Sequence, residues 1–84
     1  MAKIMMLTQD NCPKCIALKN YLEMGLRNKY AADIEVVKRE DDPERFKMLA
    51  LDHGIMATPA LIGEQDVLVD TSPSKVNAFL EKNI

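Results

Sequence analysis

The two cysteines of this chain are separated by only a proline and a lysine, in the segment "NCPKC" that ends at Cys15. Thiolates at this spacing can bind a metal ion together, form a structural disulfide, or alternate between dithiol and disulfide in an exchange reaction. Because there is no other cysteine, Cys12 and Cys15 are the pair on which any of these roles depends. The residues around the pair have to decide between the three kinds of site.

A structural disulfide is the first role to be set aside. The apolar run near the start, Ile4 to Leu7, is shorter than the roughly 7 to 15 residues that the core of a signal peptide needs. No segment approaches the length needed to span a membrane. We therefore expect a cytoplasmic protein without a membrane partner, whose thiols are kept reduced. In that compartment a cysteine pair is more often catalytic or metal-binding than structural.

A metal site needs more ligands than the pair provides. Tetrahedral zinc takes four ligands, and beyond Cys12 and Cys15 the sequence offers only His53. A metal or iron-sulfur carrier would have to share its cysteine pairs between two chains, or add an external thiol. That alternative stays open, as does a pair of buried, unreactive thiols. The expectation adopted here is that the site holds no metal and needs no cofactor.

Length, composition and charge limit the fold and the partners. With 84 residues, of which 48% are hydrophobic and 29% charged, residues 1–84 are expected to form one globular domain and a monomer. The net charge is -2, with both signs interspersed, and the aromatic residues are only two tyrosines and two phenylalanines. A basic stripe that follows phosphates is absent from the sequence, so nucleic-acid binding is not expected.

The cysteines lie where a strand is expected to give way to a helix. The apolar run 3–7 is typical of a buried strand, and the helix after it is expected to begin at Pro13. Cys12 then faces the free amide groups and the positive end of the helix dipole, which favour a thiolate. Pro13 restricts the backbone, while Lys14 adds a positive charge that the negative charge of Asp10 is expected to offset in part.

The rest of the chain predicts an α/β fold with a small mixed sheet and three helices. Strand character returns at 33–40, and 66–70 is close enough to 58–62 for an antiparallel hairpin. Helices are indicated by apolar spacing and by prolines at their first positions. The expected order is β-α-β-α-β-β-α, with helical faces formed by Cys15, Leu18, Leu22 and Leu26, by Phe46, Leu49 and Ala50 after Asp42 and Pro43, and by Val76, Phe79 and Leu80 after Ser72 and Pro73.

A second informative segment is "GIMATPALI", in which Pro59 begins an expected strand. Together with "CPKC" after a strand, and the hairpin and helix that follow, it resembles the thioredoxin and glutaredoxin superfamily over nearly the whole chain. The resemblance is greatest to short, glutaredoxin-sized thioredoxins with a CPxC active site. It implies the thioredoxin fold, a four-stranded sheet, and a cis bond between Thr58 and Pro59 beside the cysteines. It also implies that the backbone of Thr58 pairs with a substrate.

We accordingly predict a dithiol-disulfide oxidoreductase that acts on substrate proteins with disulfides. Cys12 attacks the substrate, Cys15 resolves the mixed disulfide, and Pro13 and Lys14 support the site. A binding module that uses the Thr58 segment without catalysis is a third class of function. The remaining charged and apolar residues receive structural interpretations: the cluster 39–45 is a solvated helix start, and Met5, Met6, Met48 and Met56 fill the core, with Met56 also near the substrate.

The electron donor is predicted from two departures from the superfamily patterns. Glutaredoxins usually have a lysine where Gln9 stands, and a Gly-Gly pair after the hairpin, where this chain has "VDTSPS". Thioredoxins usually have "WCGPC", whereas this chain has no tryptophan. Without the lysine and the glycines, glutathione loses a charge partner and a close backbone approach. We therefore expect a flavoprotein disulfide reductase as the donor, and glutathione, as for a glutaredoxin, is the alternative.

Overall fold

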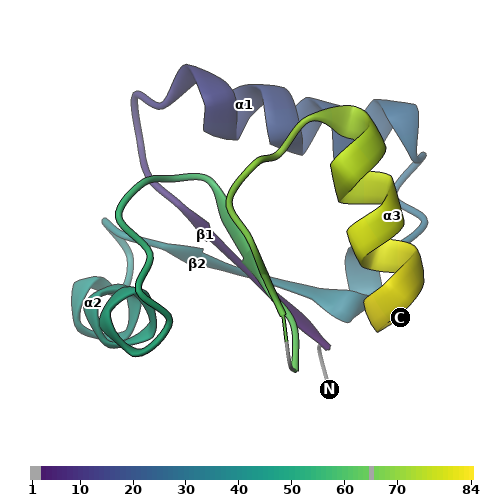
Figure 1. The fold of residues 1–84 in the computed structure, drawn as a ribbon. Helices are drawn as coiled ribbons and strands as arrows, with labels where there is room; N and C mark the ends of the chain where they lie inside the picture. The colour runs from purple at the N-terminus through teal and green to yellow at the C-terminus, as the bar shows by residue number, and fades with distance from the viewer. Residues whose placement is uncertain (1–2, 65) are drawn as a thin grey trace.

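Seven main elements follow one another in the predicted β-α-β-α-β-β-α order (Figure 1). The computed structural model describes residues 3–64 and 66–84. The strands are β1 (Ile4–Thr8), β2 (Ile34–Lys38), β3 (Ala60–Ile62) and β4 (Val67–Leu68), and the helices are α1 (Pro13–Asn20), α2 (Pro43–Asp52) and α3 (Pro73–Asn83). The predicted fold class, with a four-stranded mixed sheet and three helices, is confirmed.

The sheet has the strand order β2-β1-β3-β4. Strand β1 pairs in parallel with β2, with Thr8 opposite Lys38, and antiparallel with β3 on its other side. Strands β3 and β4 form the predicted antiparallel hairpin. Because β1 and β2 run in parallel, the loops that leave their carboxyl ends lie at the same edge of the sheet, and the first of these loops leads to Cys12.

Helices cover both faces of the sheet, with α1 and α3 on one side and α2 on the other (Figure 1). Successive residues of β1 point to opposite faces, so Met6 packs beneath α1 and α3, while Leu7 packs beneath α2. The first cluster is closed by the buried residues Leu18, Val76, Phe79 and Leu80, and the second by the partly buried Phe46, Leu49 and Ala50. These are the apolar helical faces that the spacing predicts.

The first helix departs from the predicted regular helix through Leu26. Segment α1 ends at Asn20, and Tyr21–Gly25 forms a turn of π-helix in which the amide of Leu26 donates to the carbonyl of Tyr21 at 2.9 Å. A Cβ atom on Gly25 would lie 2.7 Å from the Tyr21 ring, so glycine lets the ring pack against the backbone. Leu22 and Leu26 still contact the core from this turn.

Two methionines predicted in the core are instead on the surface. The side chain of Met48 is 64% exposed and that of Met56 is 98% exposed, whereas Met6 is buried as predicted. Met48 lies on the outer face of α2, and Met56 lies in the loop between α2 and β3, where no element covers it. Within residues 3–64 and 66–84, no helix has the length and apolar character needed to cross a bilayer.

Candidate redox site

Cys12 and Cys15 lie at the start of α1, as the sequence predicts. Cys12 is the N-cap residue with extended backbone (φ -113, ψ 102), and Pro13 is the first residue of the helix. The Cα atoms of the two cysteines are 5.2 Å apart, and their sulfur atoms form a disulfide. Both side chains are largely buried, with 8% of Cys12 and 4% of Cys15 exposed. Both residues therefore count as buried, and which sulfur meets a substrate stays a prediction.

The sulfur of Cys12 is the side chain that caps the helix. The backbone amide of Cys15 donates to Cys12 Sγ at 3.2 Å, which satisfies one of the free amides of the first turn. In the reduced protein this donor and the positive end of the helix dipole both favour a negative charge on Cys12 Sγ. Since Cys15 lies inside the helix and its sulfur has no such amide donor among the described residues, the two thiols are electrostatically unequal.

The loop before β3 brings Thr58 and Pro59 to the same place. The Thr58-Pro59 peptide bond is cis, as the resemblance implies. Cys12 Sγ lies 3.8 Å from the carbonyl oxygen of Thr58 and 3.7 Å from its hydroxyl oxygen, although the two residues are 46 positions apart. Pro59 is buried and Thr58 is partly exposed, so Thr58 lies at the surface beside the sulfur. Four predicted site residues therefore meet in space.

Lys14 and Asp10 do not compensate each other as expected. Asp10 instead forms an ion pair with Lys38, with Nζ and Oδ1 2.7 Å apart. The carboxylate of Asp10, which hydrogen-bonds to this amine, raises the pKa of Lys38. Lys14 is exposed and has no ion pair among the described residues. Its positive charge, two positions after Cys12 in the sequence, is therefore not offset by a direct carboxylate contact among the described residues.

The loop before Cys12 is held by residues that the sequence interpretation assigned to a solvated helix start. Both carboxylate oxygens of Glu40 accept from the backbone amide of Asp10, at 3.1 and 3.0 Å. The Arg39 amide donates to the Thr8 carbonyl at 3.0 Å. Arg39 and Glu40 are both exposed, as a solvated cluster predicts, but their contacts with the loop before Cys12 were not predicted. The sequence signal that points to them is indirect: the parallel pairing of the two strands puts their following loops side by side.

Within the described parts of the chain, no group of three His, Cys, Asp or Glu side chains is arranged to hold a metal ion. A metal bound by Cys12 and Cys15 would therefore take its remaining ligands from another molecule, as the two-chain carrier requires. His53, the other candidate in the sequence, is exposed at the carboxyl end of α2.

Comparison with solved structures finds the same architecture. The thioredoxin-like protein BC3987 superposes with a TM-score of 0.72 at 25% identity, over 90% of this chain and 97% of that one. A variant of that protein gives a TM-score of 0.74 at 24% identity, over 93% and 99% of the two chains. A glutaredoxin from Archaeoglobus fulgidus gives 0.67 at 24% identity, over 95% and 87%. The chain has the thioredoxin fold. Neither a protein-family model nor a curated protein matches the sequence.

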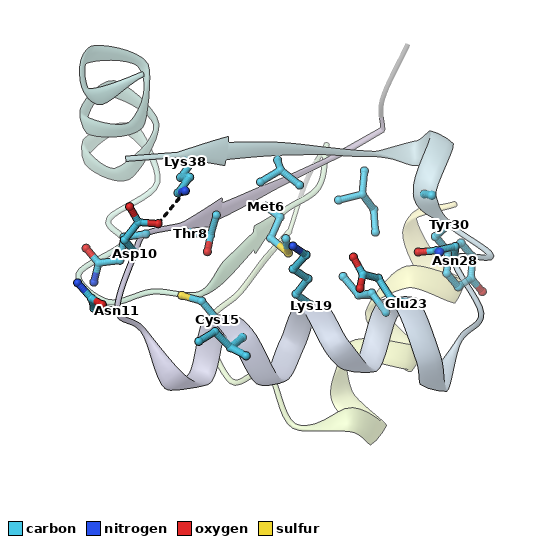
Figure 2. A pocket seen from close by; sticks show the side chains of 16 residues that line it. Met6, Thr8, Asp10, Asn11, Cys15, Lys19, Glu23, Asn28, Tyr30 and Lys38 are labelled. Carbon is cyan, nitrogen blue, oxygen red and sulfur yellow. Dashed lines mark ion pairs between the residues drawn. The ribbon is translucent and has the colours of Figure 1, made fainter. Parts of the chain in front are cut away.

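A thioredoxin fold with two cysteines at the start of its first helix supports a thiol-disulfide redox role. Two grooves lie in this region, one lined in part by Cys15 and the other by Thr58. The first, which we call the α1 groove, has a volume of about 440 Å³ and runs between α1 and strands β1 and β2. Figure 2 shows Cys15 near one end, with Asp10 and its ion pair to Lys38 above it, and Tyr30 at the other end. The groove follows the face of β2 that α1 leaves uncovered, where Val36 is 56% exposed.

The second groove, which we call the Thr58 groove, has a volume of about 230 Å³. It lies between the loop before β3, helix α2 and the loops after β1 and β2. Its lining residues are Gln9, Arg39, Phe46, Ala50, Ile55, Met56, Ala57 and Thr58. Neither cysteine lines this groove, but Thr58, which does, also contacts Cys12 Sγ. Met56 lines this groove together with Thr58, and the binding of a substrate there stays a prediction.

Proposed function

We propose that this chain is a dithiol-disulfide oxidoreductase that reduces disulfides of substrate proteins. The observation that supports it most is the environment of Cys12 Sγ, which accepts an amide hydrogen bond at the helix start and lies beside the carbonyl of the partly exposed Thr58. The first contact stabilises an attacking thiolate, and the second provides a backbone site where a substrate segment can be held next to it.

The exchange consists of two displacement steps. The thiolate of Cys12 attacks one sulfur of the substrate disulfide, a bond forms between the two sulfurs, and the other substrate sulfur leaves as a thiolate that takes up a proton. Cys15 then loses its proton and attacks Cys12 Sγ, which forms the Cys12-Cys15 disulfide and releases the first substrate sulfur as a second thiolate. Two electrons pass from the protein to the substrate, and no cofactor takes part.

Insulin reduction tests this proposal. The reduced wild-type protein, recycled by dithiothreitol, should accelerate the precipitation of insulin chains over dithiothreitol alone. The Cys12→Ser variant should lose the acceleration. Reduced Cys15→Ser, mixed with insulin after dithiothreitol is removed, should still attack once and accumulate a mixed disulfide at Cys12. A wild-type protein that gives no acceleration, or a Cys12→Ser variant that gives as much as wild type, would refute the proposal.

The same proposal includes a flavoprotein disulfide reductase as the electron donor, a monomeric state and a cytoplasmic location. Two contacts support the choice of donor over glutathione. Gln9 stands where glutaredoxins usually have lysine, and its side-chain oxygen accepts from Arg39 at 3.2 Å. After the hairpin, the Asp70 carboxylate is bound by Lys75 at 2.7 Å and by the Ser72 amide at 3.3 Å. The Gln9 amide oxygen and the Asp70 carboxylate therefore already have partners, and neither group offers a positive charge to the carboxylates of a tripeptide.

The donor is tested by NADPH consumption. The oxidised protein is offered either a thioredoxin-reductase-type enzyme or millimolar glutathione with glutathione reductase, and absorbance of NADPH is followed. We expect faster turnover with the flavoprotein reductase. Faster turnover with glutathione, together with removal of glutathione from a small mixed disulfide, would assign the chain to the glutaredoxins instead.

A further inference from the structure

The Thr58 groove has a mixed polar and apolar lining with a single charged residue. Phe46, Ala50, Ile55 and Met56 line it with apolar atoms, and Arg39 is the one charged residue among its lining residues. Its volume of about 230 Å³ is smaller than the roughly 300 to 1,000 Å³ of a pocket that encloses a whole ligand. It therefore suits one or two side chains of a substrate segment that is already held at Thr58.

The guanidinium group of Arg39 carries a charge that the described residues do not neutralise. Its Nη1 donates to the neutral side-chain oxygen of Gln9 at 3.2 Å, and no described carboxylate lies within ion-pair distance. Arg45, in contrast, is bound through both terminal nitrogens by Glu35, at 2.7 and 2.8 Å. Arg39 therefore has donors left for an incoming carboxylate, and a planar guanidinium can bind one through two nitrogens.

The acidic residues that follow Arg39 are turned to other partners. The Glu40 carboxylate accepts from the Asp10 amide, and Asp42 accepts from the Arg45 amide at the start of α2. Neither residue lines the Thr58 groove, nor does Asp41. The charge that a side chain in this groove meets is consequently that of Arg39.

We propose that the Thr58 groove selects substrate segments in which an acidic and an apolar residue flank the attacked cysteine, with Arg39 binding the carboxylate. This inference rests on the proposed exchange at Cys12. The apolar residues of the lining favour substrates that also have an apolar side chain. A small acidic disulfide such as oxidised glutathione has no such side chain to place there. Arg39 is thus a residue that determines specificity, and it takes no part in the transfer of electrons.

The experiment measures single-turnover reduction of peptide disulfides by the reduced protein. Three homodimeric peptides carry leucine near their cysteine together with glutamate, glutamine or lysine. A fourth peptide carries glutamate, with serine in place of leucine. Reactions are quenched with acid and analysed by mass spectrometry. Each rate constant is divided by that of the same peptide with dithiothreitol, which removes the intrinsic reactivity of the disulfide.

The wild-type protein should prefer the glutamate peptide over the lysine peptide by about twofold to fivefold, the range of an exposed ion pair. It should reduce oxidised glutathione and the serine peptide more slowly than the peptide with both residues. The preference for glutamate should weaken in 1 M salt, where the screening length is about 3 Å. Arg39→Gln should abolish the charge preference, Arg39→Glu should reverse it, and Arg39→Lys should retain part of it.

Lys47→Gln is the matched control, because it removes one positive charge from the exposed surface of α2 outside the groove. It should keep the wild-type preference. Equal normalised rates for the glutamate, glutamine and lysine peptides, or an Arg39→Gln variant with the wild-type preference, would overturn this inference while leaving the exchange reaction intact. If the wild-type protein reduces none of the peptides, the proposed function itself fails.

Discussion

Cys12 and Cys15 differ in what their sulfur atoms contact, although they are neighbours in the same turn. Cys12 Sγ accepts the Cys15 amide at 3.2 Å and lies beside Thr58, while Cys15 is inside the helix and only 4% exposed. Limiting iodoacetamide added to the reduced protein near neutral pH should therefore label Cys12 first, because the thiolate is the reactive form. Peptide mapping by mass spectrometry measures the ratio. Preferential labelling of Cys15 would contradict the assignment of the attacking sulfur.

Asn11, immediately before the pair, has a left-handed backbone with φ 58. Asparagine and glycine tolerate this region, whereas a β-branched residue meets a steric penalty of about 1–2 kcal/mol. Asn11→Val should lower the free energy of unfolding by this amount, and Asn11→Gly should be close to wild type. Urea denaturation of the variants in the same redox state gives the comparison. Equal stability of Asn11→Val and Asn11→Gly would show that the backbone at position 11 adopts another conformation.

The residues around Cys12 and Cys15 were sufficient to predict a cysteine pair at the start of a helix. Contacts between distant loops were not predicted. Cys12, Cys15 and Pro13 are adjacent, and the resemblance supplied Thr58 and Pro59. Arg39 and Glu40, in contrast, act on residues about thirty positions earlier, through a register between parallel strands that composition does not reveal. A charge cluster at a helix start gives the same sequence pattern whether its side chains are solvated or bound.

At the scale of elements, each main helix begins with a proline, but only some caps use a side chain. Asp42 Oδ1 accepts the Arg45 amide at 3.3 Å, while Ser72 makes no side-chain capping bond to α3. Asp42→Ala should therefore lower the free energy of unfolding by about 0.5–2 kcal/mol, and Ser72→Ala by less than about 0.5 kcal/mol. Chemical denaturation of both variants tests the difference. If Ser72→Ala were less stable than Asp42→Ala, this description of the caps would be contradicted.

Element types were predictable because apolar spacing and prolines act locally, and their exact ends were less so. The strand expected at 3–7 is Ile4–Thr8, and the helix expected through Leu26 ends at Asn20. The π-helical turn that follows depends on the Tyr21 ring packing against Gly25, a contact within the folded core. Met56 is exposed because no helix or strand covers the loop between α2 and β3 at this point. A local sequence pattern does not specify whether a loop is covered.

For the molecule as a whole, the ion pair between Glu35 and Arg45 joins β2 to α2 on the face of the sheet that α2 covers. The hydrogen bond from Arg45 lowers the pKa of the Glu35 carboxyl from its ordinary 4.5. A carboxyl whose pKa is lower in the folded state stabilises the protein above its unfolded pKa, and this contribution is lost as the pH falls through the folded value.

The stability difference between wild type and Glu35→Gln should accordingly be constant near neutral pH and shrink as the pH falls below 4.5. It should also be small and reduced by salt, because both side chains are exposed. Thermal unfolding of both proteins across this pH range measures it. A difference that stays constant on acidification would mean that the pair contributes through packing and not through charge.

The reduction potential of the Cys12-Cys15 pair is the most direct test of whether these two cysteines exchange electrons with other disulfides. The protein is equilibrated in glutathione buffers for the upper part of the potential range and in dithiothreitol buffers for the lower part, its free thiols are trapped, and the reduced fraction is measured by mass spectrometry. We predict a reversible two-electron transition between about -270 and -120 mV, the range of dithiol exchange proteins. A pair that is reduced only below about -300 mV, as structural disulfides are, or that never forms a disulfide within the chain, would contradict the account.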